Sequence, residues 1–208
     1  HCAGFVLRGI FLGSQKELDW FLNGIRHVFP EAWNAFVGFL PEDEWADIVG
    51  GYYRRLKDSD PMVHLPAAEA WNRYETSCSV LQSNFTEEPP SGGGSGSLAL
   101  ALIEVHYFKN GMFLDDGFLL KNIDRLKNIP LVIVQGRYDM ICPIVTADEL
   151  ARAWPEARFV EDPESPRRWV ETTYGAREGG EARRGGGPHS MERRRRSARV
   201  PPRGGTRL

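Results

Sequence analysis

Long hydrophobic runs are absent from this 208-residue chain, so no stretch of about eighteen apolar residues predicts a membrane-spanning helix. An initiating Met is also absent, and no basic segment precedes an apolar one, so no signal peptide is recognisable. Cysteine is scarce: Cys2, Cys78 and Cys142 form neither a C-x-x-C pair nor a pair with a nearby His. These absences argue against zinc, a disulfide framework and membrane association, and they favour a cytoplasmic protein.

Apolar residues are almost missing from one end of the chain, where the sign of the charge also changes. Residues 1–166 carry 14 Lys and Arg against 24 Asp and Glu, a net charge of −10, whereas residues 167–208 carry 12 Arg against 4 Glu, a net charge of +8. Residues 164–208 cannot bury enough surface to offset their ordering entropy, so we expect a disordered basic tail. Its Arg runs are typical of an RNA-binding or nuclear-localisation patch, and a misread exon or frame would give the same residues.

Hydrophobic residues make up 41% of the whole chain. This content suits one domain with a sizeable core. Residues 4–12 and 129–134 are rich in β-branched and aromatic residues and predict strands; the second is apolar throughout, as in a parallel sheet covered on both faces. Residues 157–160 predict a third strand. Between the first two strands, residues 14–128 have helical periodicity, and this helical insertion is typical of a lid over a site.

Prolines and helix-capping residues indicate where helices begin and end in the helical insertion and in the segment after it. Ser14 with Glu17, and Thr146 with Glu149, have the spacing of capping boxes, and Ser97 is expected as an N-cap. The expected helices run from 14 to before Pro30 and over 42–57, 66–78, 98–109, 118–126 and 146–154. Residues 87–97 are Pro-, Gly- and Ser-rich and predict a flexible loop. Ser95 within it is not expected to be a nucleophile, since no strand precedes it and residue 97 is not Gly.

Three carboxylates stand out as candidates for chemistry. Asp139 follows the second expected strand and so falls at the carboxyl edge of the sheet, where it would either face a ligand or close a turn. Glu75 and Glu104 lie on expected helices among aromatic residues; singly each fits a solvated helix face, and together they would bind a substrate ammonium. His106 is a possible general base, although a hydrogen-bonded structural role is more common at such a position.

Several segments resemble the proline iminopeptidases, also called prolyl aminopeptidases, which are α/β-hydrolases. The resemblance spans residues 4–163 and is interrupted by the Pro-, Gly- and Ser-rich loop at 87–97. It is carried by VLRGIFLG at 6–13, KELDWF at 16–21, FPEAW at 29–33, IEVHYF at 103–108, NID at 122–124, IVQGRYD at 133–139 and CP at 142–143. It implies a partial α/β-hydrolase fold with one core strand in residues 1–13, a helical cap in 14–128, the C-terminal core strands in 129–163 and the tail in 164–208.

The resemblance also implies an activity and roles for residues of this chain. A member of this family is a serine peptidase that releases N-terminal proline from peptides with a Ser-His-Asp triad and no cofactor. Asp139 corresponds to the triad acid, which orients the catalytic imidazole. Glu75 and Glu104 correspond to cap carboxylates that hold the proline amino group, and Tyr107 is expected as a pocket wall, with ordinary core packing as the alternative.

The family pattern is incomplete in this chain. The nucleophile elbow and the oxyanion loop precede the first strand in the family, and here that strand begins the chain, so we expect an inactive fragment of a longer protein. The family's Gly-His-Ser motif is matched only by Gly187-Pro188-His189-Ser190, which makes His189 the candidate base. Because the composition changes where the family pattern ends, we favour a misread frame for the tail and do not expect a nucleic-acid partner.

Two other interpretations stay open, as does the oligomeric state. Another capped α/β-hydrolase that acts on epoxides or esters would share the fold, but neutral substrates give Glu75 and Glu104 nothing to bind. A non-catalytic protein whose basic tail binds RNA is the second alternative.

Overall fold

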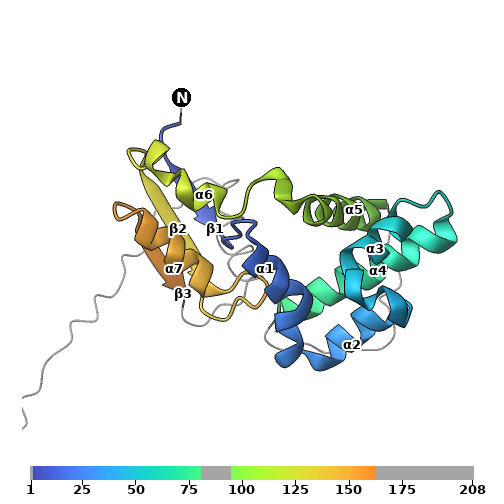
Figure 1. Cartoon of the computed structure of the whole chain (residues 1–208). Helices are drawn as coiled ribbons and strands as arrows, with labels where there is room; N and C mark the ends of the chain where they lie inside the picture. The colour runs from blue at the N-terminus through green and yellow to red at the C-terminus, as the bar shows by residue number, and fades with distance from the viewer. Residues whose placement is uncertain (1, 81–94, 163–208) are drawn as a thin grey trace, which may run out of the picture. The chain divides into compact units, whose positions relative to one another are not determined.

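The fold is built around three parallel strands whose order in the sheet follows the chain, β1-β2-β3. The computed structural model describes residues 2–80 and 95–162, which all fall in one compact unit. β1 (Phe5–Arg8) pairs with β2 (Leu131–Gly136), and β2 pairs with β3 (Arg158–Asp162) (Figure 1). All three expected strands are therefore present. The first is shorter than expected because Gly9 adopts a positive φ of 56° that ends the extended backbone after Arg8.

Helices fill the segment between β1 and β2, and a further helix connects β2 to β3. The α-helices are α1 (Gln15–Asp19), α2 (Pro30–Gly38), α3 (Ile48–Leu56), α4 (Pro61–Cys78), α5 (Ser95–Lys109), α6 (Phe118–Lys121) and α7 (Ile144–Ala153). Shorter turns complete them: a π-helical turn (Trp20–Gly24) and 3₁₀ turns over Ile25–His27, Glu42–Asp47, Gly111–Phe113 and Ile123–Arg125.

Helix starts test the expected caps directly. The capping box at Ser14 is confirmed: the Glu17 carboxylate accepts hydrogen bonds from the Ser14 backbone N–H at 2.9 Å and hydroxyl at 2.8 Å. The expected capping box at Thr146 is wrong, because α7 begins two residues earlier, behind Pro143, and Thr146 is buried within its first turn.

Two further helix starts differ from expectation. Ser97 is not an N-cap: α5 begins at Ser95, and the Asn72 amide donates to the Ser97 carbonyl and hydroxyl. Helix α4 begins at Pro61 instead of near Pro66, since the Asp60 side chain accepts a hydrogen bond from the Met62 N–H and caps the earlier turn. The expected loop 87–97 thus ends before residue 95, and its earlier part lies outside the described residues, as do His189 and the tail.

An aromatic core holds the helices of the insertion together. Phe36 of α2 stacks on Tyr52 of α3 and on Tyr74 of α4, with ring centroids 4.8 and 4.2 Å apart. Both tyrosines are fully buried and donate to backbone carbonyls, Tyr52 to Phe36 and Tyr74 to Phe21. Trp71, also fully buried, packs edge-on against Phe36 and Tyr52. These contacts fix α2, α3 and α4 against one another.

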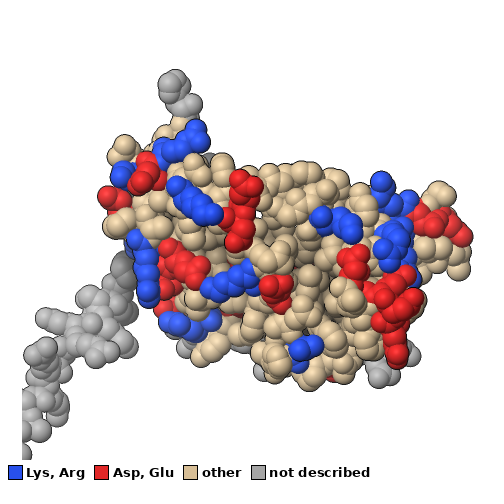
Figure 2. All heavy atoms as spheres, in the orientation of Figure 1, with Lys and Arg blue, Asp and Glu red and all other residues tan. Residues whose placement is uncertain are grey.

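A second core lies between the sheet and its flanking helices. Ile133 of β2 is fully buried, and Ala147, Leu150 and Trp154 from α7 and its end pack with it. Leu131 and Ile133, which lie on one face of β2, thus pack against α7, while Val134 on the opposite face is also buried. Acidic and basic side chains are interspersed on the face shown in Figure 2. Within residues 2–80 and 95–162, we find no helix with the length and apolarity needed to cross a bilayer.

The buried core predicts a loss of stability at alkaline pH. Burial raises the pKa of the Cys78 thiol to about 12 and the pKa of Tyr52 and Tyr74 well above the usual value of tyrosine. In the unfolded chain these groups lose their protons from about pH 9 upward, while the folded chain keeps them, so stability is full below that pH and falls above it. Each group contributes a slope of about 1.4 kcal/mol per pH unit. The free energy of unfolding, measured in urea between pH 8 and 11, should fall steeply.

Tyr52→Phe should reduce that slope, because it removes one titrating group. A slope in Tyr52→Phe equal to that of the unaltered chain would contradict the assignment.

Candidate functional site

A pocket of about 720 Å³ brings three of the candidate residues together. Glu75 comes from α4, and Glu104 and Tyr107 come from α5. The other lining residues are Phe11, Thr76, Ser79, Leu100, Ile103, Phe108 and Met112. The pocket therefore combines two half-buried carboxylates with walls that are mostly apolar or aromatic.

Glu104 is held in place by the aromatic core. The indole N–H of Trp71 donates to Glu104 Oε2 at 2.7 Å. Trp71 is fully buried, and the rings of Phe21 and Phe108 lie against it at centroid distances of 5.7 and 5.8 Å. Because the donor cannot move, the carboxylate has a fixed orientation and a charge-assisted hydrogen bond.

The outer wall of the pocket is an apolar face of α5. Leu100, Ile103 and Tyr107 follow one another at helical spacing, and Ile103 is 60% exposed. Tyr107 meets Phe113 edge-on at 5.4 Å. Carboxylates beside such a face suit a ligand that carries a positive charge next to an apolar body.

His106 does not line this pocket. Its ring packs near Phe113, with centroids 5.4 Å apart, and near Tyr53, at 6.1 Å, while Asn110 Nδ2 lies 3.5 Å from its Nδ1. These neighbours agree with the structural interpretation of His106 and give no support to a role as general base.

Asp139 lies just beyond the carboxyl end of β2 and is 1% exposed. Its Oδ1 accepts hydrogen bonds from the backbone N–H groups of Ile141 at 3.1 Å and Cys142 at 2.8 Å. The side-chain amide of Gln135 donates to its Oδ2 at 3.2 Å. Asp139 therefore does close a turn, and the same contacts fix its carboxylate at the edge of the sheet where ligands of such folds bind.

The loop that carries Asp139 is anchored at both ends. Arg137 forms a two-pronged ion pair with Glu161 of β3, with distances of 2.7 and 2.6 Å. Trp20 donates its indole N–H to the carbonyl of Met140 at 2.7 Å. Ile141 and Cys142 pack into the core of the helical insertion, so this loop touches both the sheet and the insertion.

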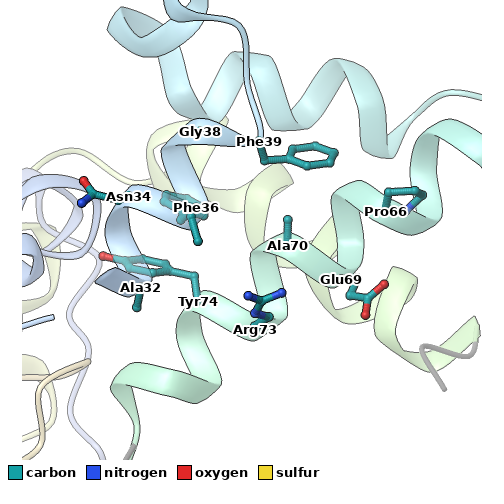
Figure 3. A pocket seen from close by; sticks show the side chains of 11 residues that line it. Ala32, Asn34, Phe36, Gly38, Phe39, Pro66, Glu69, Ala70, Arg73 and Tyr74 are labelled. Atoms are coloured by element: carbon teal, nitrogen blue, oxygen red, sulfur yellow. The ribbon is translucent and has the colours of Figure 1, made fainter. Parts of the chain in front are cut away.

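A second pocket, of about 470 Å³, lies between α2 and α4 (Figure 3). Arg73 and Glu69 of α4 line it together with Asn34 and Phe39, and none of the candidate residues does. Helix α4 thus contributes Glu69 to one pocket and Glu75 to the other, which makes Glu69 a useful comparison for Glu75. No group of three or more His, Cys, Asp and Glu side chains within the described ranges is arranged to hold a metal ion.

Two residues of the site were not predicted from the sequence. Trp71 lies one helical turn before Glu75, and no spacing rule links it to Glu104, 33 residues later. Gln135 had a signal that could have been used: it is a polar residue at the end of an apolar strand, and a buried polar side chain requires partners.

The elements described so far define an α/β protein with a parallel sheet and a helical insertion that carries a pocket with two carboxylates. No family model matches the chain. A proline iminopeptidase of Arabidopsis thaliana is 43% identical over 160 residues, which are 76% of this chain and 42% of that protein. A probable proline iminopeptidase of Leptolyngbya boryana is 41% identical over 172 residues, or 79% and 52% of the two chains. A proline iminopeptidase of Xylella fastidiosa (strain 9a5c) is 42% identical over 158 residues, or 73% and 49%.

The chain is a relative of the proline iminopeptidases. It spans about half the length of the curated relatives it matches.

Asp139→Asn should destabilise the chain by about 2–3 kcal/mol, because an amide NH₂ would replace one of two carboxylate oxygens that both accept hydrogen bonds in a buried site. Urea unfolding of the full chain measures this change. The control is Asp124→Asn: Asp124 is 81% exposed and paired with Lys127, so its loss should cost less than about 1 kcal/mol. Similar losses in both variants would contradict the described contacts of Asp139.

Proposed function

We propose that this chain forms the substrate-binding cap and supplies the triad acid of a proline iminopeptidase, a serine hydrolase that releases N-terminal proline from peptides. The observation that carries the proposal is the meeting of Glu75 and Glu104 in one apolar pocket, in a chain related to this family. Residues 1–13 and 129–163 would then be parts of an α/β-hydrolase core, and residues 14–128 would be its cap.

Recognition of the substrate follows from the chemistry of the pocket. An N-terminal proline carries a protonated secondary amine on an apolar ring. Glu75 and Glu104 would accept its two N–H groups, while Phe11, Tyr107 and Phe108 would pack against the ring and exclude water. Trp71 would keep the Glu104 carboxylate aimed at the amine.

Asp139 would act on the reaction through the catalytic histidine. A serine attacks the carbonyl of proline, the histidine takes the serine proton and delivers it to the leaving amine, and the acid holds the imidazole in the right tautomer and stabilises its charged form. The fixed carboxylate of Asp139 suits that role. The candidate base His189 lies outside the described residues, and no residue of this chain is assigned as the nucleophile.

Other hydrolases with a cap are the second candidate. An epoxide or ester substrate is neutral and would make no use of the charge of two carboxylates in the pocket. The peptide substrate is therefore favoured. We also propose a cytoplasmic location, because three cysteines at unrelated spacings fit a reducing compartment.

Binding of L-prolinamide to the full 208-residue chain tests the amine site without requiring catalysis. Glu75→Gln and Glu104→Gln should each weaken binding about tenfold or more in titration calorimetry, because each removes a charged acceptor of the ammonium. Glu69→Gln, on the other side of α4, should bind like the unaltered chain. N-acetyl-L-prolinamide has no ammonium, and if it bound as tightly as L-prolinamide the proposed site would be wrong.

A chimera tests the catalytic role of Asp139. Residues 4–162 of this chain would replace the matching segment of the Xylella fastidiosa relative, and the release of nitroaniline from L-proline 4-nitroanilide would be followed. The chimera should be active, and Asp139→Asn in it should lower kcat by about 10⁴-fold, as for the triad acid of other serine proteases. Asp124→Asn is the control and should keep full activity. An Asp139→Asn chimera with undiminished kcat would exclude Asp139 as the triad acid.

A further inference from the structure

Gln135 is a completely buried polar side chain in a strand that is otherwise apolar. It is the fifth residue of β2, and its exposed fraction is 0%. A buried amide costs free energy unless its hydrogen bonds are made, and an apolar residue of similar size would avoid that cost. The contacts of Gln135 therefore indicate what its presence achieves.

Each end of the Gln135 amide is engaged. Its Oε1 accepts a hydrogen bond from the backbone N–H of Ile10 at 2.9 Å. Its Nε2 donates to Asp139 Oδ2 at 3.2 Å and to the carbonyl of Cys142 at 2.8 Å. The orientation of the amide is fixed, because exchanging its N and O would set a donor against the Ile10 N–H and an acceptor against two oxygens.

These contacts connect two parts of the site. Ile10 directly precedes Phe11, which lines the pocket with Glu75 and Glu104. Asp139 lies on the loop after β2. The side chain of Gln135 thus links Ile10, in the segment between β1 and the pocket, to the carboxylate of Asp139.

We propose that Gln135 is a positioning residue for Asp139, which rests on the role of Asp139 in the proposed function. The Ile141 and Cys142 N–H groups hold Oδ1, and Gln135 holds Oδ2, so the carboxylate has one plane and one direction. Because Gln135 also accepts a hydrogen bond from Ile10, it fixes the direction of the Asp139 carboxylate relative to Phe11 in the pocket wall. The histidine that contacts Asp139 is then held at a constant position relative to the bound substrate amine.

Gln135→Met is the first test, since methionine has a similar size and no hydrogen-bonding amide. In the full chain, the backbone amide hydrogens of Ile141 and Cys142 should exchange at least tenfold faster. The reference is the backbone amide of Ile133, which lies in β2 with Gln135 and should not change by this factor. A residue that only stabilised the fold would accelerate all three amides alike. In the chimera, kcat per titrated active site should fall about tenfold while KM changes less than twofold.

Gln15→Met is the matched control. Gln15 also donates its side-chain amide to a carboxylate, that of Asp19, but on the surface. It should change neither the exchange rates nor kcat. If Gln135→Met does not fold, Gln135→Asn serves instead: it keeps a neutral amide in the buried site but is one methylene shorter, so it cannot hold the Ile10 N–H and Asp139 in the present geometry, and it should show the same two effects.

The outcomes separate the two proposals. Unchanged kcat and unchanged exchange in Gln135→Met, with a chimera that Asp139→Asn inactivates, would overturn the role of Gln135 and leave the proposed function in place. An inactive chimera with the unaltered segment would count against the proposed function. The exchange rates in the full chain would then still decide whether Gln135 holds Asp139.

Discussion

The parallel pairing of β1 with β2 is the constraint on which the described structure depends. Phe5 lies opposite Leu131, so residues about 125 positions apart in the chain are neighbours. The ends of the helical insertion are thereby fixed side by side on the sheet. Loop-closure entropy grows only slowly with loop length, so an insertion of this size is tolerated once its own core is stable. The pairing also brings Ile10 to Gln135, and through it to Asp139.

The aromatic core of the insertion serves both stability and the pocket. Trp71 packs among buried rings with its apolar surface and points its single polar group at Glu104. A carboxylate near a large apolar cluster needs such a donor, because burial without a partner is costly. The same packing that fixes α4 against α2 and α3 therefore determines where one of the two carboxylates lies, and the position of the pocket is a property of the core.

Local signals in the sequence were sufficient for most of the fold. The apolar run of β2, the periodicity of α3, α4, α5 and α7 and the capping box of Ser14 depend on neighbouring residues, and they were predicted correctly, whereas α2 was not predicted. Ser97 and Thr146 were misjudged, because α5 begins at Ser95 and α7 begins at Ile144, directly after Pro143. The meeting of Glu75 with Glu104 depends on how two helices pack, which no spacing rule supplies; their aromatic neighbours suggested a joint role, and the family resemblance strengthened it. Gln135 was visible as a polar residue in an apolar strand, but its bond to Ile10 depends on strand pairing, so its role could not be read from the sequence.

The long separation between β1 and β2 also has a consequence for the order of folding. Contacts within the insertion join residues that are close in the chain, such as Phe36 with Tyr52, and contacts of this kind form quickly. The pairing of β1 with β2 has a far higher contact order and must follow. During synthesis on the ribosome, β1 emerges long before its partner strand exists. The backbone N–H and C=O groups on the edge of β1 that β2 later covers are exposed to other chains during that interval, and the strand limits this hazard by being only four residues long.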